Sequence, residues 1–387
     1  MIKALRGMKD ILEDDRFLKI FDIAREVAEN YGFSYIETPV LEETALFKRS
    51  VGESSDIVNK EMYQFLDKGG NDVCLRPEGT AGVVRSFIEH KFDRQQTPKR
   101  FWYFGPMFRY ERPQKGRFRE FHQFGVESFG EPSIYEDINI ISMAADIFDR
   151  LGINYTLKIN SLGCNECMPK YKEKLVEFLN QHKDALCEDC QRRITQNPIR
   201  TLDCKNENCQ AILKDAPKIT NNLCETCQVD FETLKNGLEN LGINYEVDKN
   251  LVRGLDYYTK TTFEFISNEI GAQSAIAGGG RYDRLVEYLG GKPTPGVGFA
   301  IGVERIMDLV KTKPQRSGIY MGALSPEAIP FIQKKAKELR KDQKVFVETK
   351  TKSLKAHLKA ADKGNYKKAM IVGEDELKEG RFFEKEL

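Results

Sequence analysis

The chain has 387 residues, of which 40% are hydrophobic and 31% are charged, and its formal net charge is +1. That length allows two or three domains of about 100 to 200 residues each. A nearly neutral charge excludes a uniformly basic protein, so any nucleic-acid surface must be a local patch, and no apolar run reaches the roughly 20 residues that a transmembrane helix needs.

The N-terminal segment contains no apolar stretch of the kind that directs secretion, so we expect a cytoplasmic protein without a membrane segment. Apolar residues recur at helical spacing over residues 16–31, and Gly32 follows as a stop signal. The next segment, FSYIETPVLEE, contains Pro39, which cannot donate a hydrogen bond to a neighbouring strand. This segment is therefore predicted to be an edge or interface strand.

A tight turn at the start of a helix is predicted for residues 76–80, RPEGT. Glu78 and Thr80 supply a carboxylate and a hydroxyl at this turn. Such groups cap a helix by accepting hydrogen bonds from its first backbone N–H groups, and they also bind an ammonium group. The segment by itself leaves both functions open.

Residues 101–127 are predicted to form an antiparallel hairpin, because polar and apolar side chains alternate along them. One face is apolar, and the other combines charged, amide and aromatic side chains: Arg109, Glu111, Phe121, Gln123 and Glu127. In the loop at residues 112–118 and just after it, Arg117 and Arg119 are expected to cover the sheet as a positively charged lid. The pattern indicates a nucleotide-binding surface. An ordinary amphipathic hairpin with Arg–Glu pairs across its strands is the alternative.

Residues 162–241 differ in composition from the rest of the chain and are interpreted as an inserted, helical module. They contain eight of the nine cysteines, in four pairs: Cys164 and Cys167, Cys187 and Cys190, Cys204 and Cys209, and Cys224 and Cys227. An odd number of cysteines in a long chain without a secretion signal favours reduced thiols. The spacing is typical of structural zinc sites, because two close sulfurs can reach one ion. Buried thiols without metal are the alternative, and the sequence leaves the choice open.

Three later segments combine glycine with charged and aromatic residues. LVRGLDYYT places Arg253, Tyr257 and Tyr258 before a predicted strand, and a turn at Gly254 with tyrosines covering the core is the alternative. AGGGRYD predicts a strand that lacks side chains on one side, where a ligand fits closely. GVGFAIGVERI places Arg305 at the start of a helix. The chain has neither of the common nucleotide-binding motifs, GxxxxGK[ST] and a strand-linked GxGxxG. If ATP is the ligand, we therefore expect arginines to bind its phosphates and an aromatic ring to stack on its base.

In this order, these segments resemble a histidyl-tRNA synthetase of the class II aminoacyl-tRNA synthetases over nearly the whole chain. TPVLE, FRYERPQKGRFREFHQFGVE and GVGFAIGVERI resemble the three class motifs, and LVRGLDYYT and AGGGRYD resemble two stretches peculiar to the histidine enzymes. The resemblance implies an α+β fold with an antiparallel six-stranded class II catalytic sheet flanked by helices. The implied domains are a catalytic domain in two parts, residues 1–161 and 242–315, a cysteine-rich helical insertion, residues 162–241, and a mixed α/β anticodon-binding domain, residues 318–387.

The resemblance implies ATP-dependent ligation of L-histidine to tRNA(His) through a histidyl-adenylate, by a homodimer and with Mg²⁺ bridging the phosphates. It assigns histidine binding to Glu78, Gly79, Thr80, Arg109, Gln123, Glu127, Arg253, Tyr257 and Tyr258, and ATP binding to Arg109, Glu111, Arg117, Phe121 and Arg305. Glu127 and Tyr258 are expected to recognise the imidazole. Arg253 and Arg109 are the implied catalytic residues, and Arg253 stabilises the charge that develops as the carboxylate attacks the α-phosphorus.

Residues 318–387 contain 16 Lys and Arg against 11 Asp and Glu, a local net charge of +5. Lys352, Lys355, Lys359 and Lys363 recur at helical spacing, which indicates a stripe that contacts tRNA phosphates. A solvated helix face is the alternative. The resemblance also implies a longer C-terminus than this chain's GRFFEKEL, which leaves open a missing last strand or a short tail.

Two rival functions are considered. One is a synthetase-like regulatory subunit that binds histidine without acylating tRNA, and the presence of Arg109, Gln123, Glu127, Arg253 and Arg305 argues against it. The other is a class II enzyme for a different amino acid, which LVRGLDYYT and Glu127 oppose. Pyrophosphate exchange into ATP that depends on histidine distinguishes all three functions.

Overall fold

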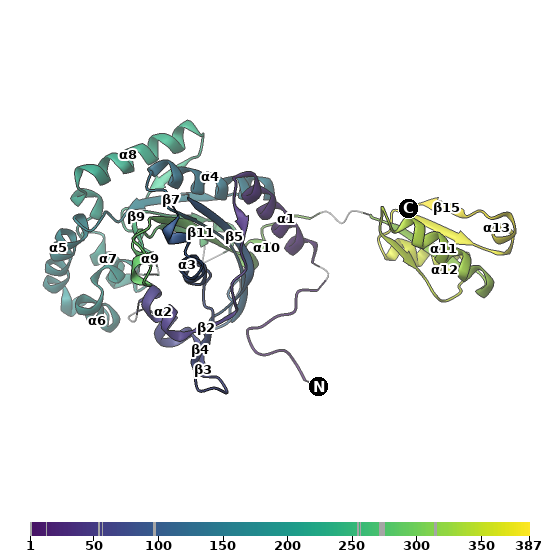
Figure 1. Ribbon diagram of the computed structural model, residues 1–387, viewed down its shortest axis with the longest axis horizontal. Coiled ribbons are helices and arrows are strands. Elements are labelled where there is room, and N and C mark those ends of the chain that lie inside the picture. The colour runs from purple at the N-terminus through teal and green to yellow at the C-terminus, as the bar shows by residue number, and fades with distance from the viewer. Residues whose placement is uncertain are drawn as a thin grey trace. The chain divides into compact units, whose positions relative to one another are not determined.

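An eight-stranded mixed sheet is the centre of the larger of two units into which the chain divides, Met1–Lys311 and Thr312–Leu387 (Figure 1). The computed structural model describes residues 2–12, 14–52, 55, 57–95, 98–253, 255, 257–270, 275–312 and 316–387. Within that part of the chain, no helix is both long enough and apolar enough to cross a membrane.

The large sheet differs from the predicted one. Its order is β1 (Ser34–Tyr35), β5 (Lys99–Phe108), β6 (Glu120–Phe129), β11 (Gly296–Gly302), β10 (Ala275–Arg281), β9 (Thr259–Ile266), β7 (Thr156–Ser161) and β8 (Tyr245–Val247). The strands from β5 to β7 pair antiparallel, whereas β1 and β8 add to the two edges in parallel. The sheet is therefore eight-stranded and mixed rather than six-stranded and antiparallel, although the six consecutive strands from β5 to β7 are antiparallel as predicted. Parallel pairing requires a crossover connection, and the cysteine-rich module is the crossover between β7 and β8.

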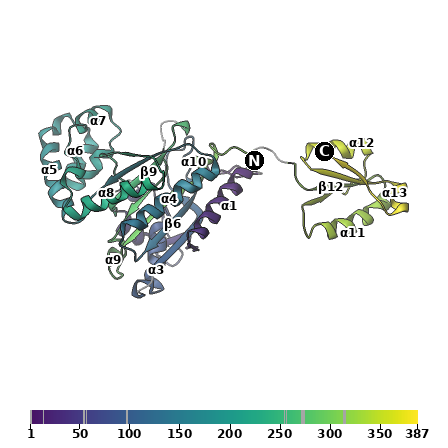
Figure 2. The same ribbon diagram turned by 90° about the horizontal axis from the view of Figure 1, so that it is seen from above.

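Helices α1 (Asp15–Asn30), α4 (Ile134–Leu151) and α8 (Glu225–Asn240) lie side by side on one face of this sheet (Figure 2). The helix predicted over residues 16–31 is α1, which begins after Asp14, whose carboxylate accepts a hydrogen bond from the backbone N–H of Arg16. The helices bury apolar side chains against the even-numbered positions of β6, Phe124 and Val126. The odd-numbered positions of β6 are thereby left for the opposite face.

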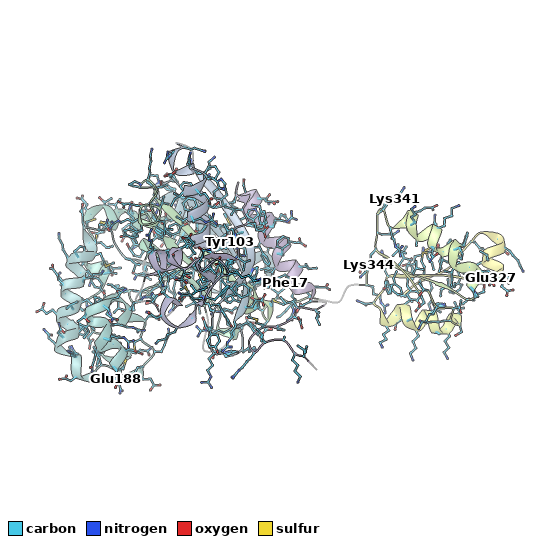
Figure 3. The ribbon with its side chains drawn as sticks, turned by 60° about the horizontal axis from the view of Figure 1, so that its bottom comes forward. Phe17, Tyr103, Glu188, Glu327, Lys341 and Lys344 are labelled. Atoms are coloured by element: carbon cyan, nitrogen blue, oxygen red, sulfur yellow. The ribbon has the colours of Figure 1, made fainter. Side chains whose placement is uncertain are left out.

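That opposite face carries α3 (Thr80–Glu89) and α9 (Leu285–Tyr288), with a second core that includes Tyr103, labelled near the middle of the larger unit in Figure 3. A small antiparallel sheet of β2 (Leu41–Glu43), β4 (Asp72–Leu75) and β3 (Tyr63–Leu66) continues from it, next to α2 (Thr44–Val51). The predicted edge strand around Pro39 is reduced to β1 and β2, and Pro39 itself lies in the irregular segment between them.

The cysteine-rich region is helical. It contains α5 (Cys167–Gln181), α6 (Glu188–Gln196), α7 (Glu207–Leu213) and the start of α8, joined by short 3₁₀ turns. Its buried core is separate from that of the large sheet and contains cysteines together with residues such as Tyr171, Leu175 and Leu179. The module therefore packs largely on itself between its two connections to the sheet.

The smaller unit is a four-stranded mixed sheet in the order β13 (Val345–Val347), β12 (Ile319–Ala323), β14 (Lys368–Val372) and β15 (Phe383–Glu386), with α11 (Ile329–Leu339), α12 (Leu354–Lys363) and α13 (Glu374–Glu379). The terminal GRFFEKEL segment forms β15, which pairs antiparallel with β14. The predicted lysine stripe is only partly correct. Lys352 lies outside α12, because Ser353 is the N-cap of the helix. Its side chain forms an ion pair with Glu348.

Candidate active site

A cavity of about 170 Å³ lies on the face of the large sheet opposite α1 and α4. Eleven residues predicted for substrate binding line it: Glu78, Thr80, Arg109, Glu111, Arg117, Phe121, Gln123, Arg253, Tyr257, Tyr258 and Arg305. They come from the start of α3, the β5–β6 hairpin, the segment before β9, and α10 (Val303–Met307). The sheet thus brings together four stretches that are far apart in the sequence. Gly254 and Asp256 of the LVRGLDYYT segment lie outside the described residues.

Glu78 caps α3 at one end of this cavity. Its carboxylate accepts hydrogen bonds from the backbone N–H groups of Thr80 (2.7 Å) and Ala81 (3.0 Å). Burial raises the pKa of Glu78, and these two N–H groups partly offset the effect. Of the two functions left open for this carboxylate, helix capping is present, and its position in the cavity wall keeps the second available.

Gly79 is not among the described residues that line the cavity, although it was predicted to bind substrate. A Cβ atom at this position would overlap the ring of Tyr103. The glycine therefore serves close packing between α3 and β5, which is the physical reason for its place in the RPEGT turn.

Glu127 lies behind the cavity wall and is almost completely buried. Its carboxylate accepts hydrogen bonds from the hydroxyls of Thr80 (2.6 Å), Tyr103 (3.4 Å) and Tyr282. Burial raises the pKa of Glu127 to about 8, the charge of Glu78 adds to this, and the Thr80 and Tyr282 hydroxyls act in the opposite direction. A carboxyl group in this state can share a proton with a basic ring at neutral pH.

Three guanidinium groups converge in the wall of the same cavity. Arg109 donates from Nε to the Pro77 carbonyl oxygen (2.8 Å) and lies 5.3 Å from the centroid of the Phe121 ring. Arg305 donates to the carbonyl oxygen of Ala275 (2.9 Å), and Arg117 forms an ion pair with Glu111. Burial lowers the pKa of Arg305, and the positive charges of Arg117 and Arg109 lower it further. Mutually repelling cations held together in this way form a site for a polyanion.

Arg119 does not form part of the predicted lid. Its guanidinium carbon lies 3.6 Å from the centroid of the Tyr110 ring, and its Nε donates to the Glu111 carbonyl oxygen (3.1 Å). Arg117 and Arg119 are two residues apart, but the chain between them is turning into β6, so strand alternation does not keep them on one side.

Arg253 lines the cavity and is held by an ion pair between its Nη1 and Glu264 Oε1 (2.7 Å). Burial acts to lower the pKa of Arg253, but the Glu264 carboxylate together with Tyr258 and Tyr257 outweighs burial, and the pKa is raised. A Cβ at Gly278 would overlap the guanidinium group, so the glycine-rich strand β10 leaves room for Arg253 itself. The predicted bare face of this strand is therefore occupied in part by a protein side chain.

Two carboxylates of the site were missed by the sequence reasoning. Glu264 is the charged residue within the apolar run TTFEFI, and an isolated charge in such a strand is the signal that could have identified it. Glu304 contacts Nδ1 of His122 (2.8 Å) and accepts from its backbone N–H (2.8 Å), which fixes α10 against β6. Glu304 thereby positions its neighbour Arg305.

The chain is similar in sequence and in fold to proteins with known names. A family model described as "Histidyl-tRNA synthetase" matches residues 7–306. A relative from Nitratiruptor sp. named histidine–tRNA ligase is 65% identical, with 100% of this chain and 96% of that protein covered. A relative of the same name from Sulfurimonas denitrificans is 62% identical, with 100% and 97% covered. The structure of apo histidyl-tRNA synthetase from S. aureus aligns with a TM-score of 0.81 and 33% identity, over 100% of this chain and 97% of that one.

Proposed function

This chain belongs to the histidyl-tRNA synthetase family, and we propose that the cavity on its large sheet carries out the family's reaction with the residues named above. The chain is an ATP-dependent histidine–tRNA ligase. Relatives that share about two thirds of its residues carry the ligase name, which separates it from both rival functions. The observation that carries the assignment of roles is that Arg109, Arg117 and Arg305 line the same cavity as Tyr258, with Glu127 buried behind its wall.

The arginines and the Phe121 ring in the cavity wall are proposed to bind ATP. Arg117 and Arg305 neutralise the outer phosphates, and Phe121 stacks on the adenine, next to Glu111. Burial lowers the pKa of Arg305, and the repulsion from Arg117 and Arg109 that adds to this effect is relieved when a triphosphate enters between the cations. Mg²⁺ is expected to accompany the nucleotide and to neutralise phosphate charge. The carboxylates in this wall are hard oxygen ligands but are already paired, so phosphate oxygens and water are its expected ligands.

The part of the cavity wall around Glu78 and Tyr258 is proposed to bind L-histidine. Glu78 and Thr80 receive the α-ammonium group, and Arg109 with Gln123 receives the carboxylate and the α-phosphate. Glu127 and Tyr258 contact the imidazole, whose ring nitrogens are one donor and one acceptor in the neutral form. Tyr103 and Tyr282 are positioning residues, because their hydroxyls hold the Glu127 carboxylate in place.

In the proposed first step, a carboxylate oxygen of histidine attacks the α-phosphorus of ATP, pyrophosphate leaves, and a histidyl-adenylate forms. A carboxylate is already ionised at neutral pH, so the step needs no general base. Arg253 stabilises the negative charge that develops on the α-phosphate, and its ion pair with Glu264 keeps it in position. In the second step, a hydroxyl of the terminal ribose of tRNA attacks the activated carbonyl and releases AMP.

Exchange of labelled pyrophosphate into ATP tests this assignment. We expect exchange with histidine and none with the other standard amino acids. Exchange that responds to another amino acid, or no exchange with any of them, would overturn the assignment of this cavity.

A homodimer is proposed from the first class motif. Exposed apolar side chains lie around it: Tyr35 (51% exposed), Leu41 (43%) and Leu66 (70%). Covering such side chains favours association. We expect a particle of twice the 44.4 kDa chain mass in sedimentation equilibrium. Residues 318–387 are proposed to bind the anticodon of tRNA(His). The product, histidyl-tRNA, is used by ribosomes, and we therefore propose that the enzyme is cytoplasmic.

A further inference from the structure

The cysteines of the inserted module form two separate four-sulfur clusters. Cys164, Cys167, Cys224 and Cys227 form the first cluster, and Cys187, Cys190, Cys204 and Cys209 form the second. Within each cluster all four Sγ atoms lie within 4.8 Å of one another, and none of the eight is in a disulfide. We infer that each cluster binds one zinc ion as a structural site. This inference chooses metal-bound thiolates over buried thiols without metal, the two alternatives that the sequence left open.

The distances between sulfurs match the dimensions of a tetrahedral zinc site. A Zn–S bond of about 2.3 Å places tetrahedral sulfurs ~3.8 Å apart. In the first cluster the Sγ atom of Cys164 lies 3.7 Å from that of Cys167 and 3.8 Å from that of Cys224. In the second cluster the Sγ atoms of Cys187 and Cys204 are 3.8 Å apart. Four sulfurs this close enclose one ion and leave no space for a multi-iron cluster.

Backbone N–H groups point at the sulfurs of both clusters. In the first, the N–H of Glu166 donates to Cys164 Sγ (3.4 Å) and that of Cys224 donates to Cys167 Sγ (3.0 Å). Such donors stabilise anionic thiolates and orient them toward a metal, whereas neutral thiols packed in an apolar core do not require them.

The second cluster has the same arrangement. The N–H of Asn206 donates to Cys204 Sγ (3.5 Å), and that of Cys187 donates to Cys209 Sγ (3.2 Å). The two clusters share no residue, so each has its own set of four sulfurs and its own amide donors. The chain therefore repeats one local design at two places in the module.

The module has a structural need for such ions. Its inner helices are short, with nine residues in α6 and seven in α7, and five of the eight cysteines are part of its buried core. A small core of this kind supplies little apolar burial, and structural zinc commonly compensates for that. The clusters are nested: the first joins the beginning of α5 to the beginning of α8, and the second joins the segments around α6 and α7 inside it.

The first cluster is also next to the catalytic residues. Gly163, which precedes it, accepts a hydrogen bond from the backbone N–H of Lys260 at the start of β9 (2.8 Å). A second cavity, of about 620 Å³, has Cys164 in its wall together with Arg253 and Tyr258. Loss of the first ion is therefore expected to disturb the active site, whereas loss of the second is expected to disturb only the module.

Metal analysis of the full-length protein, purified without chelator, tests the inference. We expect about two zinc ions per chain by mass spectrometry of the metal, one for each tetrathiolate site. Cys227→Ser and Cys190→Ser should each lower the content by one, and Cys74→Ser is the matched control that should keep both ions, because Cys74 is buried in a different core. A wild-type content below one zinc per chain, or iron with a visible absorption band, would overturn the inference.

A second measurement does not depend on the folding of variants. Titration of the wild-type thiols with an organomercurial should release two zinc ions to a colorimetric chelator as the eight cluster sulfurs react. Free reaction of all nine thiols without zinc release overturns the inference. If the wild-type protein holds about one zinc ion per chain, and only one of Cys227→Ser and Cys190→Ser removes it, the cluster of that cysteine is a zinc site and the inference is overturned for the other cluster.

Discussion

Burial determines the chemistry of the two most informative side chains of the cavity. Arg253 is enclosed but keeps its charge, because Glu264 lies within hydrogen-bond distance. Burial raises the pKa of Glu127 to about 8, and its hydrogen-bond partners among the described residues are hydroxyl groups. The first group can act on a developing negative charge, and the second can exchange a proton with an imidazole.

Replacing Arg253 by alanine should abolish adenylate formation and leave histidine binding nearly intact, because its proposed partner is the phosphate in the transition state. We expect histidine-dependent pyrophosphate exchange to fall by about 10²- to 10³-fold, while the dissociation constant for histidine from calorimetry changes only a few fold. Arg150→Ala, which removes an exposed ion pair with Glu26, is the control and should change neither. Exchange within a few fold of wild type would remove Arg253 from the mechanism.

The raised pKa of Glu127 predicts a pH-dependent stability. Between the ordinary value of 4.5 and about 8, the unfolded chain loses the proton while the folded protein retains it. Stability is therefore expected to fall as pH rises through this window and to level off above it. The glutamine in Glu127→Gln cannot titrate, so the variant does not lose this stability. The unfolding free energy of the variant minus that of wild type should therefore increase by up to about a few kcal/mol from pH 5 to 8. Urea unfolding at several pH values measures this, and a constant difference would contradict the assignment.

At the scale of elements, the glycines of the central strands make room for functional side chains. Gly278 on β10 gives space to the Arg253 guanidinium, and Gly298 on β11 gives space to the Glu127 carboxylate. The two strands pair with each other, so the backbone of the sheet itself forms the wall of the cavity. The sequence predicts only that these strands lack side chains at the glycines. The packed structure shows that the side chains of Arg253 and Glu127 occupy the space.

Gly278→Ala should displace Arg253 without breaking the sheet, because alanine is compatible with the extended backbone there. A displacement of about 1 Å at a reacting centre costs up to about 10²-fold in rate, so we expect pyrophosphate exchange to fall by tens-fold with a small change in Tm. Gly69→Ala, in an exposed turn of the small sheet, is the matched control. If Gly278→Ala keeps full activity, Arg253 does not need its observed position.

At the scale of the whole molecule, the two units separate the proposed functions. The cavity lies entirely within Met1–Lys311, and the local charge of +5 belongs to residues 318–387. In the smaller unit, Lys355, Lys359 and Lys363 are exposed on α12, while Leu354, Leu358 and Ala361 pack toward its core. Proposed tRNA contacts of this unit should therefore affect charging and leave amino-acid activation unchanged.

Replacing Lys355, Lys359 and Lys363 together by alanine should raise the KM for tRNA by about 10-fold and flatten the salt dependence of charging, because phosphate contacts release counterions. Pyrophosphate exchange should stay at the wild-type level. The control is a triple alanine variant that removes the same charge on and just beyond α11, at Lys334, Lys337 and Lys341. If both triple variants have the same effect, the lysines of α12 do not form a specific tRNA-binding surface and act only through the net charge of the unit.

Much of the fold and site could be predicted from local patterns. Alternation along the β5–β6 hairpin placed Phe121 and Gln123 on the face that lines the cavity, because side-chain direction in a strand depends only on position. Helical spacing identified α1 in the same way. The edge strand β8 could not be found, because three residues are too short to establish a period, and the edge strand predicted around Pro39 is correct only for the short pieces β1 and β2.

The sequence by itself determined the family, the stretches that contribute to the cavity and the pairs of neighbouring cysteines, because each of these is written in short continuous segments. Only the tertiary structure decided that Glu264 holds Arg253, that Arg119 turns away from the cavity, and that Cys164 and Cys167 join Cys224 and Cys227 about 60 residues later. These features depend on which side chains the folded backbone brings within a few ångströms of one another. No local periodicity encodes that proximity, because it is a property of packing between distant segments.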